Sequence, residues 1–281
     1  MDTEEEEERN KFSRRLRKDR NAGPQVDLVH VSTSTGLPSH AGVGLAQALL
    51  KHILFIRQQI PMPYDQLKAE IRMQASQAHE EGGRRRRPNA YIRKASKLVE
   101  ASEFVLEGLS KLISKTRVLG ILISLGPTPI NPKQAFILRF DSSGLPSAPE
   151  PAKGLKDPSR IMIRQVVTSG LEQFDSQSLP TKTFVMALVA PGIGSPGNTD
   201  CLGTEEADWR EGWVARHGFS PKLKRCRPVG ISVGPDPFCG EEFPTPLTGV
   251  GDQQGVSAGM GLVWVQHGSF IRGLPHDASG I

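Results

Sequence analysis

Apolar residues recur every three to four positions between residues 42 and 60, which is the spacing of an amphipathic helix with one buried face. At 100° per residue, seven side chains share one arc: Leu45, Ala46, Leu49, Leu50, Ile53, Leu54 and Ile56. Lys51, Gln58 and Gln59 fall on the opposite side. Phe55 is an aromatic residue among these polar positions, so we expect it to face solvent or a partner.

Two prolines follow this helix. Pro61 and Pro63 lack the amide hydrogen that a further turn needs, and each pushes the preceding residue toward extended backbone. We therefore expect the helix to end at Ile60. A short second helical segment is expected from Asp65 to Met73.

Further elements follow from the same periodicities. A long amphipathic helix is expected over Tyr91–Lys115, and a third packing helix begins at Asp157 and Pro158 and extends to Phe174. Short β-rich runs predict strands at Val26–Ser32, Arg117–Leu125, Gln134–Asp141, Lys182–Ala190, Leu262–Gln266 and Ser269–Arg272. This order predicts an α+β domain, with a largely antiparallel sheet and three helices packed on one side.

The composition of the 281-residue chain indicates which parts form a domain and which form tails or loops. The chain contains 29 glycines and 22 prolines but only 6% aromatic residues, so we expect one domain with extensive loops. Residues 1–24 have the composition of a disordered charged tail, the domain spans 25–274, and 275–281 form a second tail. The expected flexible loops are 75–90, 142–156, 191–218 and 230–260. The last two are the long irregular loops of the C-terminal part.

The last of these loops is expected because of its prolines. Pro235, Pro237, Pro244 and Pro246 cannot occupy a central strand, so residues 230–261 are expected to be an irregular insertion or a segment foreign to the fold.

The net charge of +5 is concentrated in two basic runs, Arg14–Arg20 and Arg84–Arg87. Arg84, Arg85, Arg86 and Arg87 form a candidate nuclear-import signal. A nuclear nucleic-acid-associated protein is the alternative interpretation, although no aromatic residues interleave with the arginines to stack bases. The acidic N-terminus does not resemble a secretory signal and no apolar run reaches bilayer length, so we expect a soluble intracellular protein without a membrane partner.

Motifs for catalysis are weak. Gly192–Gly197 (GIGSPG) satisfies the dinucleotide pattern, but Pro196 lies inside it and no clear helix or acidic ribose ligand follows. The histidines and the three cysteines have no metal-ligand or nucleophile spacing. We therefore expect no enzyme activity, no cofactor, no metal and no small-molecule ligand, and we expect binding to another protein.

The run LLKHILFIRQQIPMPYDQLK (residues 49–68) resembles the first helix and turn of the comet family, which binds the mitotic-arrest-deficient checkpoint protein Mad-two. Four later segments resemble the same family in the same order: RVLGILISLGPTPINPKQAF, TFVMA, GFSPKL and LVWVQHGSFIRGL. The resemblance implies a HORMA-like fold and a non-enzymatic adaptor. It would bind closed Mad-two and present it to an AAA+ remodelling ATPase, which silences the spindle assembly checkpoint.

By position, the resemblance implies two contact sites. The Mad-two site comprises Phe55, Ile56, Gln59, Ile163 and Arg164, and the ATPase site comprises Pro221 and Lys222. The family has glutamine at the position of Ile56 and phenylalanine at that of Ile163, so both contact sites are altered. The implied location is nucleus and cytoplasm, with the spindle or kinetochore during mitosis.

Overall fold

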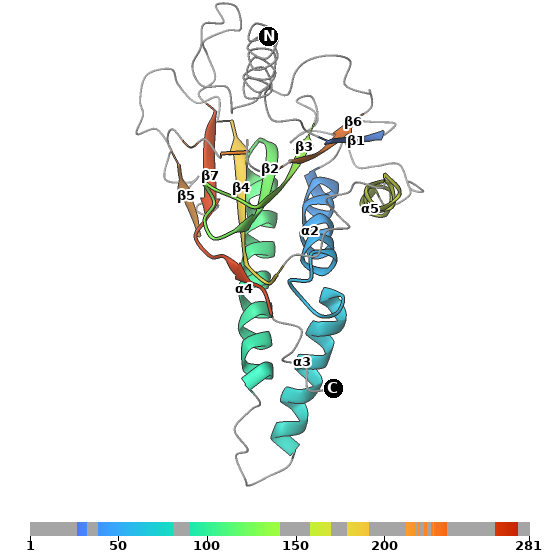
Figure 1. Cartoon of the computed structure of the whole chain (residues 1–281), viewed down its shortest axis with the longest axis vertical. Coiled ribbons are helices and arrows are strands. Elements are labelled where there is room, and N and C mark those ends of the chain that lie inside the picture. Colours follow the sequence, from blue (N-terminus) through green and yellow to red (C-terminus); the bar gives the residue numbers. More distant parts are fainter. Residues whose placement is uncertain are drawn as a thin grey trace, which may run out of the picture.

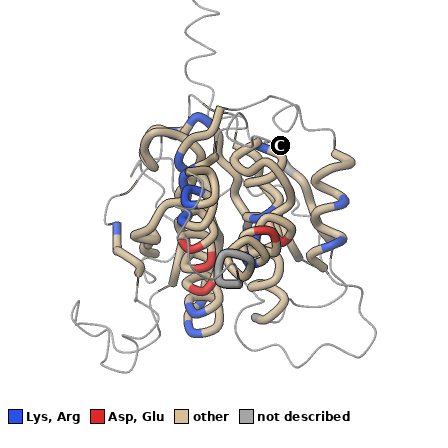
Figure 2. The backbone as a smooth tube through the Cα atoms, turned by 90° about the horizontal axis from the view of Figure 1, so that it is seen from below, with Lys and Arg blue, Asp and Glu red and all other residues tan. Residues whose placement is uncertain are grey.

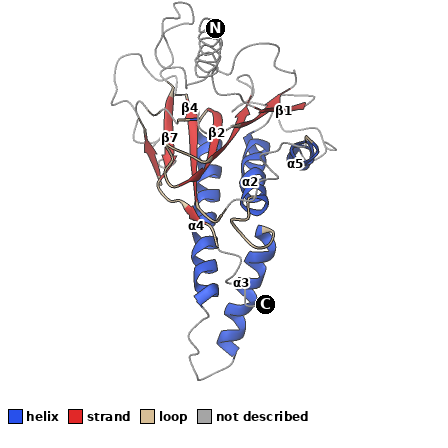
Figure 3. Ribbon diagram, in the orientation of Figure 1, coloured by secondary structure: helices blue, strands red, loops and turns tan. Residues whose placement is uncertain are grey.

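The computed structural model describes the following residues: 27–32, 39–80, 90–140, 158–169, 179–190, 212–216, 219, 222–223, 226, 228–234 and 262–274. Within them lie one eight-stranded sheet and four helices (Figures 1 and 3). The helices are α2 (Ser39–Ile56), α3 (Tyr64–Glu80), α4 (Ala90–Lys115) and α5 (Pro158–Thr168). The strands are β1 (Asp27–Ser32), β2 (Val118–Gly126), β3 (Gln134–Phe140), β4 (Lys182–Val189), β5 (Trp213–Ala215), β6 (Val229–Gly234), β7 (Val263–His267) and β8 (Ile271–Arg272).

The sheet has the order β1-β6-β3-β2-β4-β7-β5, and β8 pairs with the beginning of β4. Strands β2, β3, β4, β5, β7 and β8 pair antiparallel, whereas β6 pairs parallel with both β1 and β3. The prediction of an α+β domain with a largely antiparallel sheet is therefore confirmed.

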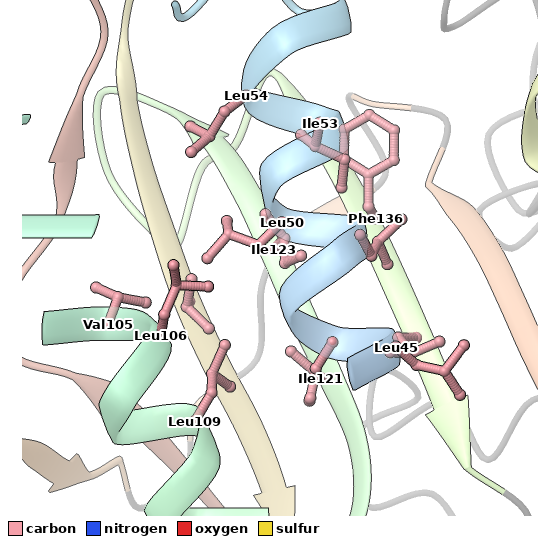
Figure 4. Close-up of a cluster of buried hydrophobic side chains, with 14 of the residues drawn as sticks. Leu45, Leu50, Ile53, Leu54, Val105, Leu106, Leu109, Ile121, Ile123 and Phe136 are labelled. Carbon is pink, nitrogen blue, oxygen red and sulfur yellow. The ribbon is translucent and has the colours of Figure 1, made fainter. Parts of the chain in front are cut away.

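The main core lies between the sheet and the helices α2 and α4 (Figure 4). Leu50 and Ile53 of α2 and Leu109 of α4 are fully buried, as are Ile123 and Phe136 of the sheet. The helical wheel is confirmed for the first six residues of its arc, from Leu45 to Leu54, while Ile56 is half-buried. None of the helices in the described part is long and apolar enough to cross a membrane.

A smaller cluster covers the other face of the sheet. It buries Leu122, Ala135 and Met186 of the central strands together with Leu223. Cys226 is half-buried beside it, and burial raises the pKa of its thiol to about 11. Cys201 and Cys239 lie outside the described residues.

The predicted end of the first helix is wrong. Helix α2 ends at Ile56, upstream of both prolines. It ends there because Gln58 adopts a left-handed conformation with φ of 51°. The Gln59 amide donates to the Leu54 carbonyl at 2.9 Å and the Gln58 amide to the Phe55 carbonyl at 2.9 Å, which is the Schellman pattern of a helix C-terminus. Gln59, placed on the polar side by the wheel, is fully buried.

The short segment expected at Asp65–Met73 is a full helix, so four helices replace the expected three. Helix α3 continues to Glu80, which also shortens the loop expected at 75–90. Residues 74–80 carry no apolar stripe, but alanine, glutamine and glutamate are strong helix formers. Periodicity alone therefore underestimates this helix, which extends with α4 beyond the sheet (Figure 1).

Two expected loops contain strands. Strand β6 occupies the start of the loop expected at 230–260 and lies between β1 and β3, and strand β5 lies inside the loop expected at 191–218. The expected loop is wrong for residues 230–234, because Pro235 follows strand β6 and does not lie within it. Apart from Gly212 and Arg216, the rest of both loops lies outside the described residues, as do residues 1–24, 142–156 and 275–281.

Candidate partner-binding surface

A hollow of about 430 Å³ lies where α2, α5 and the start of α3 meet. Figure 1 shows α5 beside α2, on the side of α2 that faces away from α4. The residues that line the hollow are Gly44, Gln47, Ala48, Lys51, His52, Phe55, Pro63, Tyr64, Asp65, Ser159 and Ile163.

The sequence brings α5 close to α2 by two features. A Cβ on Gly44 would lie 3.3 Å from Ser159 Oγ, so the absence of a side chain at Gly44 lets the helices approach. Met162 and Val166 of α5 are fully buried, while Ile163 is half-buried and packs against the core beside them. Ile163 therefore anchors α5 and still borders the hollow.

Phe55 forms the opposite part of the lining. Its side chain is 40% exposed, as expected from its place on the polar side of the helical wheel. Phe55 and Ile163 are more than a hundred positions apart in the sequence, and the fold brings both to one hollow. Both therefore contribute apolar side chains to the lining of the same hollow.

A polar network borders the hollow. Lys51 Nζ lies 2.8 Å from Asp65 Oδ1 and 5.2 Å from the centre of the Tyr64 ring. The Tyr64 hydroxyl donates to Glu103 Oε1 at 2.6 Å, and Lys68 Nζ lies 2.6 Å from Glu103 Oε2. These contacts tie the start of α3 to α2 and α4.

This network shifts the pKa values of two groups. Burial, followed by the hydrogen bond to Glu103, raises the pKa of Tyr64 well above its usual value. Burial alone would raise the pKa of Glu103, but the hydrogen bonds from Lys68 and Tyr64 outweigh it and lower that pKa. Tyr64 is thus a neutral donor and Glu103 an ionised acceptor at neutral pH.

His52 also lines the hollow. Burial lowers its pKa, and its Nε2 atom is buried without a hydrogen-bond partner among the described residues. At neutral pH the imidazole is therefore uncharged. Within the described residues, no group of three or more histidine, cysteine, aspartate or glutamate side chains could hold a metal ion.

The apolar hollow and its rim suit contact with a protein, and comparison with known proteins gives the family. The model of the p31comet family, described as "Mad1 and Cdc20-bound-Mad2 binding", matches residues 5–149, which is more than half of the chain. The chain belongs to the p31comet family. The resemblance seen in residues 49–68 is thereby confirmed.

Two curated relatives of this chain carry the name MAD2L1-binding protein. The human protein is 37% identical over 92 residues, which are 32% of this chain and 34% of the human protein. The mouse protein is 36% identical over 92 residues, covering 32% of this chain and 33% of the mouse protein. The matched segment thus spans about a third of the length of these relatives, and both are named as binding proteins.

The other predicted contact residues of this p31comet-family chain are distributed as follows. Ile56 is half-buried and Arg164 is exposed, and both are near the hollow in sequence but do not line it. Gln59 is fully buried: its side-chain amide donates to the Arg57 carbonyl at 2.7 Å, and its oxygen accepts from the Thr181 amide at 2.7 Å. Gln59 is therefore positioned to support the surface and not to contact a partner directly.

The predicted ATPase contacts lie elsewhere. Lys222 is exposed, and its backbone amide donates to the Ile130 carbonyl at 2.8 Å, which fixes it beside the β2–β3 turn. Pro221 lies outside the described residues. So do Arg84, Arg85, Arg86 and Arg87 and the segment Gly192–Gly197.

Sequence reasoning missed the rim of the hollow. Lys51, Tyr64 and Asp65 read as ordinary helix residues, because their contact depends on the turn between α2 and α3. One signal was available in the sequence. The two prolines at 61 and 63 force a short reversal that places the first turn of α3 against the end of α2.

Proposed function

We propose that this chain is a HORMA-like adaptor that binds closed Mad2, the Mad-two protein named above, through the hollow between α2, α3 and α5. Phe55 and Ile163 form its apolar centre, and Ile56 and Arg164 form its edge. The observation that carries the proposal is the meeting of Phe55 and Ile163 at one hollow. The names of the matched family and of its relatives supply the partner.

The chemistry of the surface supports a protein partner. Aromatic residues, phenylalanine among them, and arginine are enriched in protein–protein interfaces, and Phe55 and Arg164 are both exposed. Lys51, Tyr64 and Asp65 add polar groups to the same lining, beside the apolar Phe55 and Ile163.

Ile56 and Ile163, the two positions that depart from the family pattern, are expected to affect the affinity for Mad2. Ile163 presents a smaller apolar side chain than the phenylalanine that the resemblance implies, and it is half-buried against the core. Ile56 cannot form the hydrogen bonds of a glutamine side chain. We therefore propose that Phe55 contributes a larger share of the binding free energy here than Ile56 or Ile163.

The test compares two exposed apolar residues. Phe55→Ala is expected to weaken binding to closed Mad2 by about 2 kcal/mol, or roughly thirtyfold, because it removes the aromatic anchor of the surface. Met73→Ala, at a 62% exposed position on α3 that does not line the hollow, is expected to change nothing. Isothermal titration with purified closed Mad2 measures both, and thermal melting confirms that each variant folds.

Two results would contradict the proposal. The first is an unchanged affinity for Mad2 in folded Phe55→Ala. The second is a large loss of stability in that variant, which would make Phe55 a core residue. A chain that ignores Mad2 but binds oligonucleotides would favour the alternative, in which the arginine runs contact nucleic acid.

We further propose that Lys222, with Pro221, contacts an AAA+ ATPase that remodels the bound Mad2 and thereby silences the spindle assembly checkpoint. Lys222 is exposed and lies outside the lining of the hollow, which would leave both contacts free to form together. This role would place the protein in the nucleus and cytoplasm, and at the spindle or kinetochore during mitosis.

A further inference from the structure

A second hollow, of about 1120 Å³, lies between the first half of α4, the start of β4 and the strand β8. It shares no lining residue with the α2–α3–α5 hollow. Its wall carries five basic side chains: Arg93, Lys94, Lys97, Lys182 and Arg272. None of the described residues that line it is acidic. We call this region the basic groove.

The five cations have no carboxylate partner within the described part of the chain. No ion pair joins Arg93, Lys94 or Lys97 to an acidic side chain there, although all three are exposed on α4. Figure 2 shows acidic positions along the helices, and apart from Asp27 the described acidic residues all lie on α3 and α4. The groove therefore presents a local excess of positive charge.

Lys182 and Arg272 add to this local excess of positive charge. They are direct cross-strand partners in the antiparallel pairing of β4 with β8, so their side chains leave the sheet on the same face. Like charges placed directly opposite one another destabilise a strand pair. A bound anion between them would remove that repulsion. Lys182 Nζ meanwhile lies 4.8 Å from the centre of the Phe270 ring.

The groove is also apolar in part. Leu98 is buried at its base, while Leu179 is 85% exposed at its edge. The Phe270 ring packs against Phe184 at 5.7 Å and lies beneath the Lys182 ammonium, so it is not a free platform for stacking a base. Aliphatic surface beside unpaired cations favours a peptide over a polynucleotide.

We propose that the basic groove binds an acidic, partly apolar peptide segment of a protein partner. Its carboxylates would lie against Lys182, Arg272 and the cations of α4, and an aliphatic side chain would cover Leu98 and Leu179. This site is separate from the surface assigned to Mad2, so one chain could hold both partners.

The experiment uses the full chain and a fluorescein-labelled peptide of alternating glutamate and leucine, with binding followed by fluorescence anisotropy. The double variant Lys182→Gln/Arg272→Gln is expected to bind the peptide roughly tenfold more weakly. Its melting temperature should change little, because the loss of the like-charge pair offsets the loss of the Lys182–Phe270 contact. The control Arg72→Gln/Lys111→Gln removes two cations outside the groove and should bind like the parent chain.

A second variant separates binding from folding. Arg93→Gln/Lys97→Gln alters only exposed helix positions, and it should weaken peptide binding without moving the melting temperature. Peptide binding that is equal in this variant, the first double variant and the parent chain would overturn the proposal. Tighter binding of oligothymidine than of the peptide would overturn it as well.

The chain's own acidic run, Glu4–Glu8, is the competing occupant. If the full chain binds the peptide only after Glu4–Glu8 are replaced by glutamine, the groove holds its own N-terminus and the proposal of a separate partner is overturned. Equal binding with and without that replacement supports it. Binding of Mad2 is expected to be the same in the parent chain and in both groove variants.

Discussion

The body of α2 and the turn that follows it are adjacent in sequence but stabilise the protein in different ways. The body, from Leu45 to Leu54, contributes an apolar stripe whose six residues are at most 1% exposed. The turn, from Arg57 to Ile60, contributes mostly polar contacts. Arg57 is fully buried, and its Nε donates to Gln134 Oε1 at 2.6 Å.

Gln59 completes the role of the turn. Its side-chain oxygen accepts from the Thr181 amide just before β4, and its backbone carbonyl accepts from the Leu274 amide just after β8, at 2.8 Å. The turn therefore connects α2 to one end of the antiparallel β4–β8 pair, where β4 begins and β8 ends. A polar residue beside a helix can thus be a buried connector, because a helical wheel applies only while the chain follows the helix.

The largest expected effect is on the body. Leu50→Ala is expected to lower the free energy of unfolding by about 2–5 kcal/mol, since it opens a cavity in a close-packed core. Ala in place of the 40% exposed Phe55 on the same helix is the matched control, and it should change stability by about 1 kcal/mol or less. Urea denaturation measures both. Similar losses in the two variants would show that α2 has no distinct buried face.

The sequence predicts the body of α2 because six apolar positions repeat with the helical period. The strands β2 and β4 are equally clear, as short apolar runs with β-branched residues. Strand β6 was missed because two glycines and nearby prolines conceal its Val-Ile-Val alternation, and only pairing with β1 and β3 reveals it.

The residues of the candidate site also differ in whether the sequence alone predicts them. The wheel identified Phe55, since an aromatic residue off the apolar arc is detectable from sequence alone. Ile163 came only from the family resemblance, because its own helix reads as core. The contact of Lys51 with Tyr64 and Asp65 was not predictable, as it arises from the reversal after Ile60. Local periodicity does not encode contacts between elements.

The second largest expected loss of stability comes from a change in the turn. Gln59→Leu is expected to destabilise the protein by about 1–3 kcal/mol, because it leaves the amide of Thr181 without the acceptor that Gln59 provides. Leucine supplies similar volume and more apolar surface, so the loss would come from hydrogen bonding. Urea denaturation gives the free energy, and amide hydrogen exchange at Thr181 should become faster.

Gln66→Leu is the control for this variant, since Gln66 is exposed on α3. It should change stability by about 0.5 kcal/mol or less. If Gln59→Leu behaves like Gln66→Leu, or is more stable than the parent chain, then the buried amide is not a connector and the difference between body and turn disappears.

The smallest expected effect on stability is at Gln58, which lies where the body of α2 meets the turn. Gln58 holds a left-handed conformation that costs a residue with a side chain about 1–2 kcal/mol, and glycine removes that cost. Glycine also gives the unfolded chain more freedom, at about 0.5–1 kcal/mol, so Gln58→Gly should raise stability by about 0.5–1 kcal/mol. Gln58→Val should lower it, since a β-branched side chain tolerates positive φ poorly. The reverse order in urea denaturation would mean that α2 continues past Ile56, and the buried position of Gln59 would then need another cause.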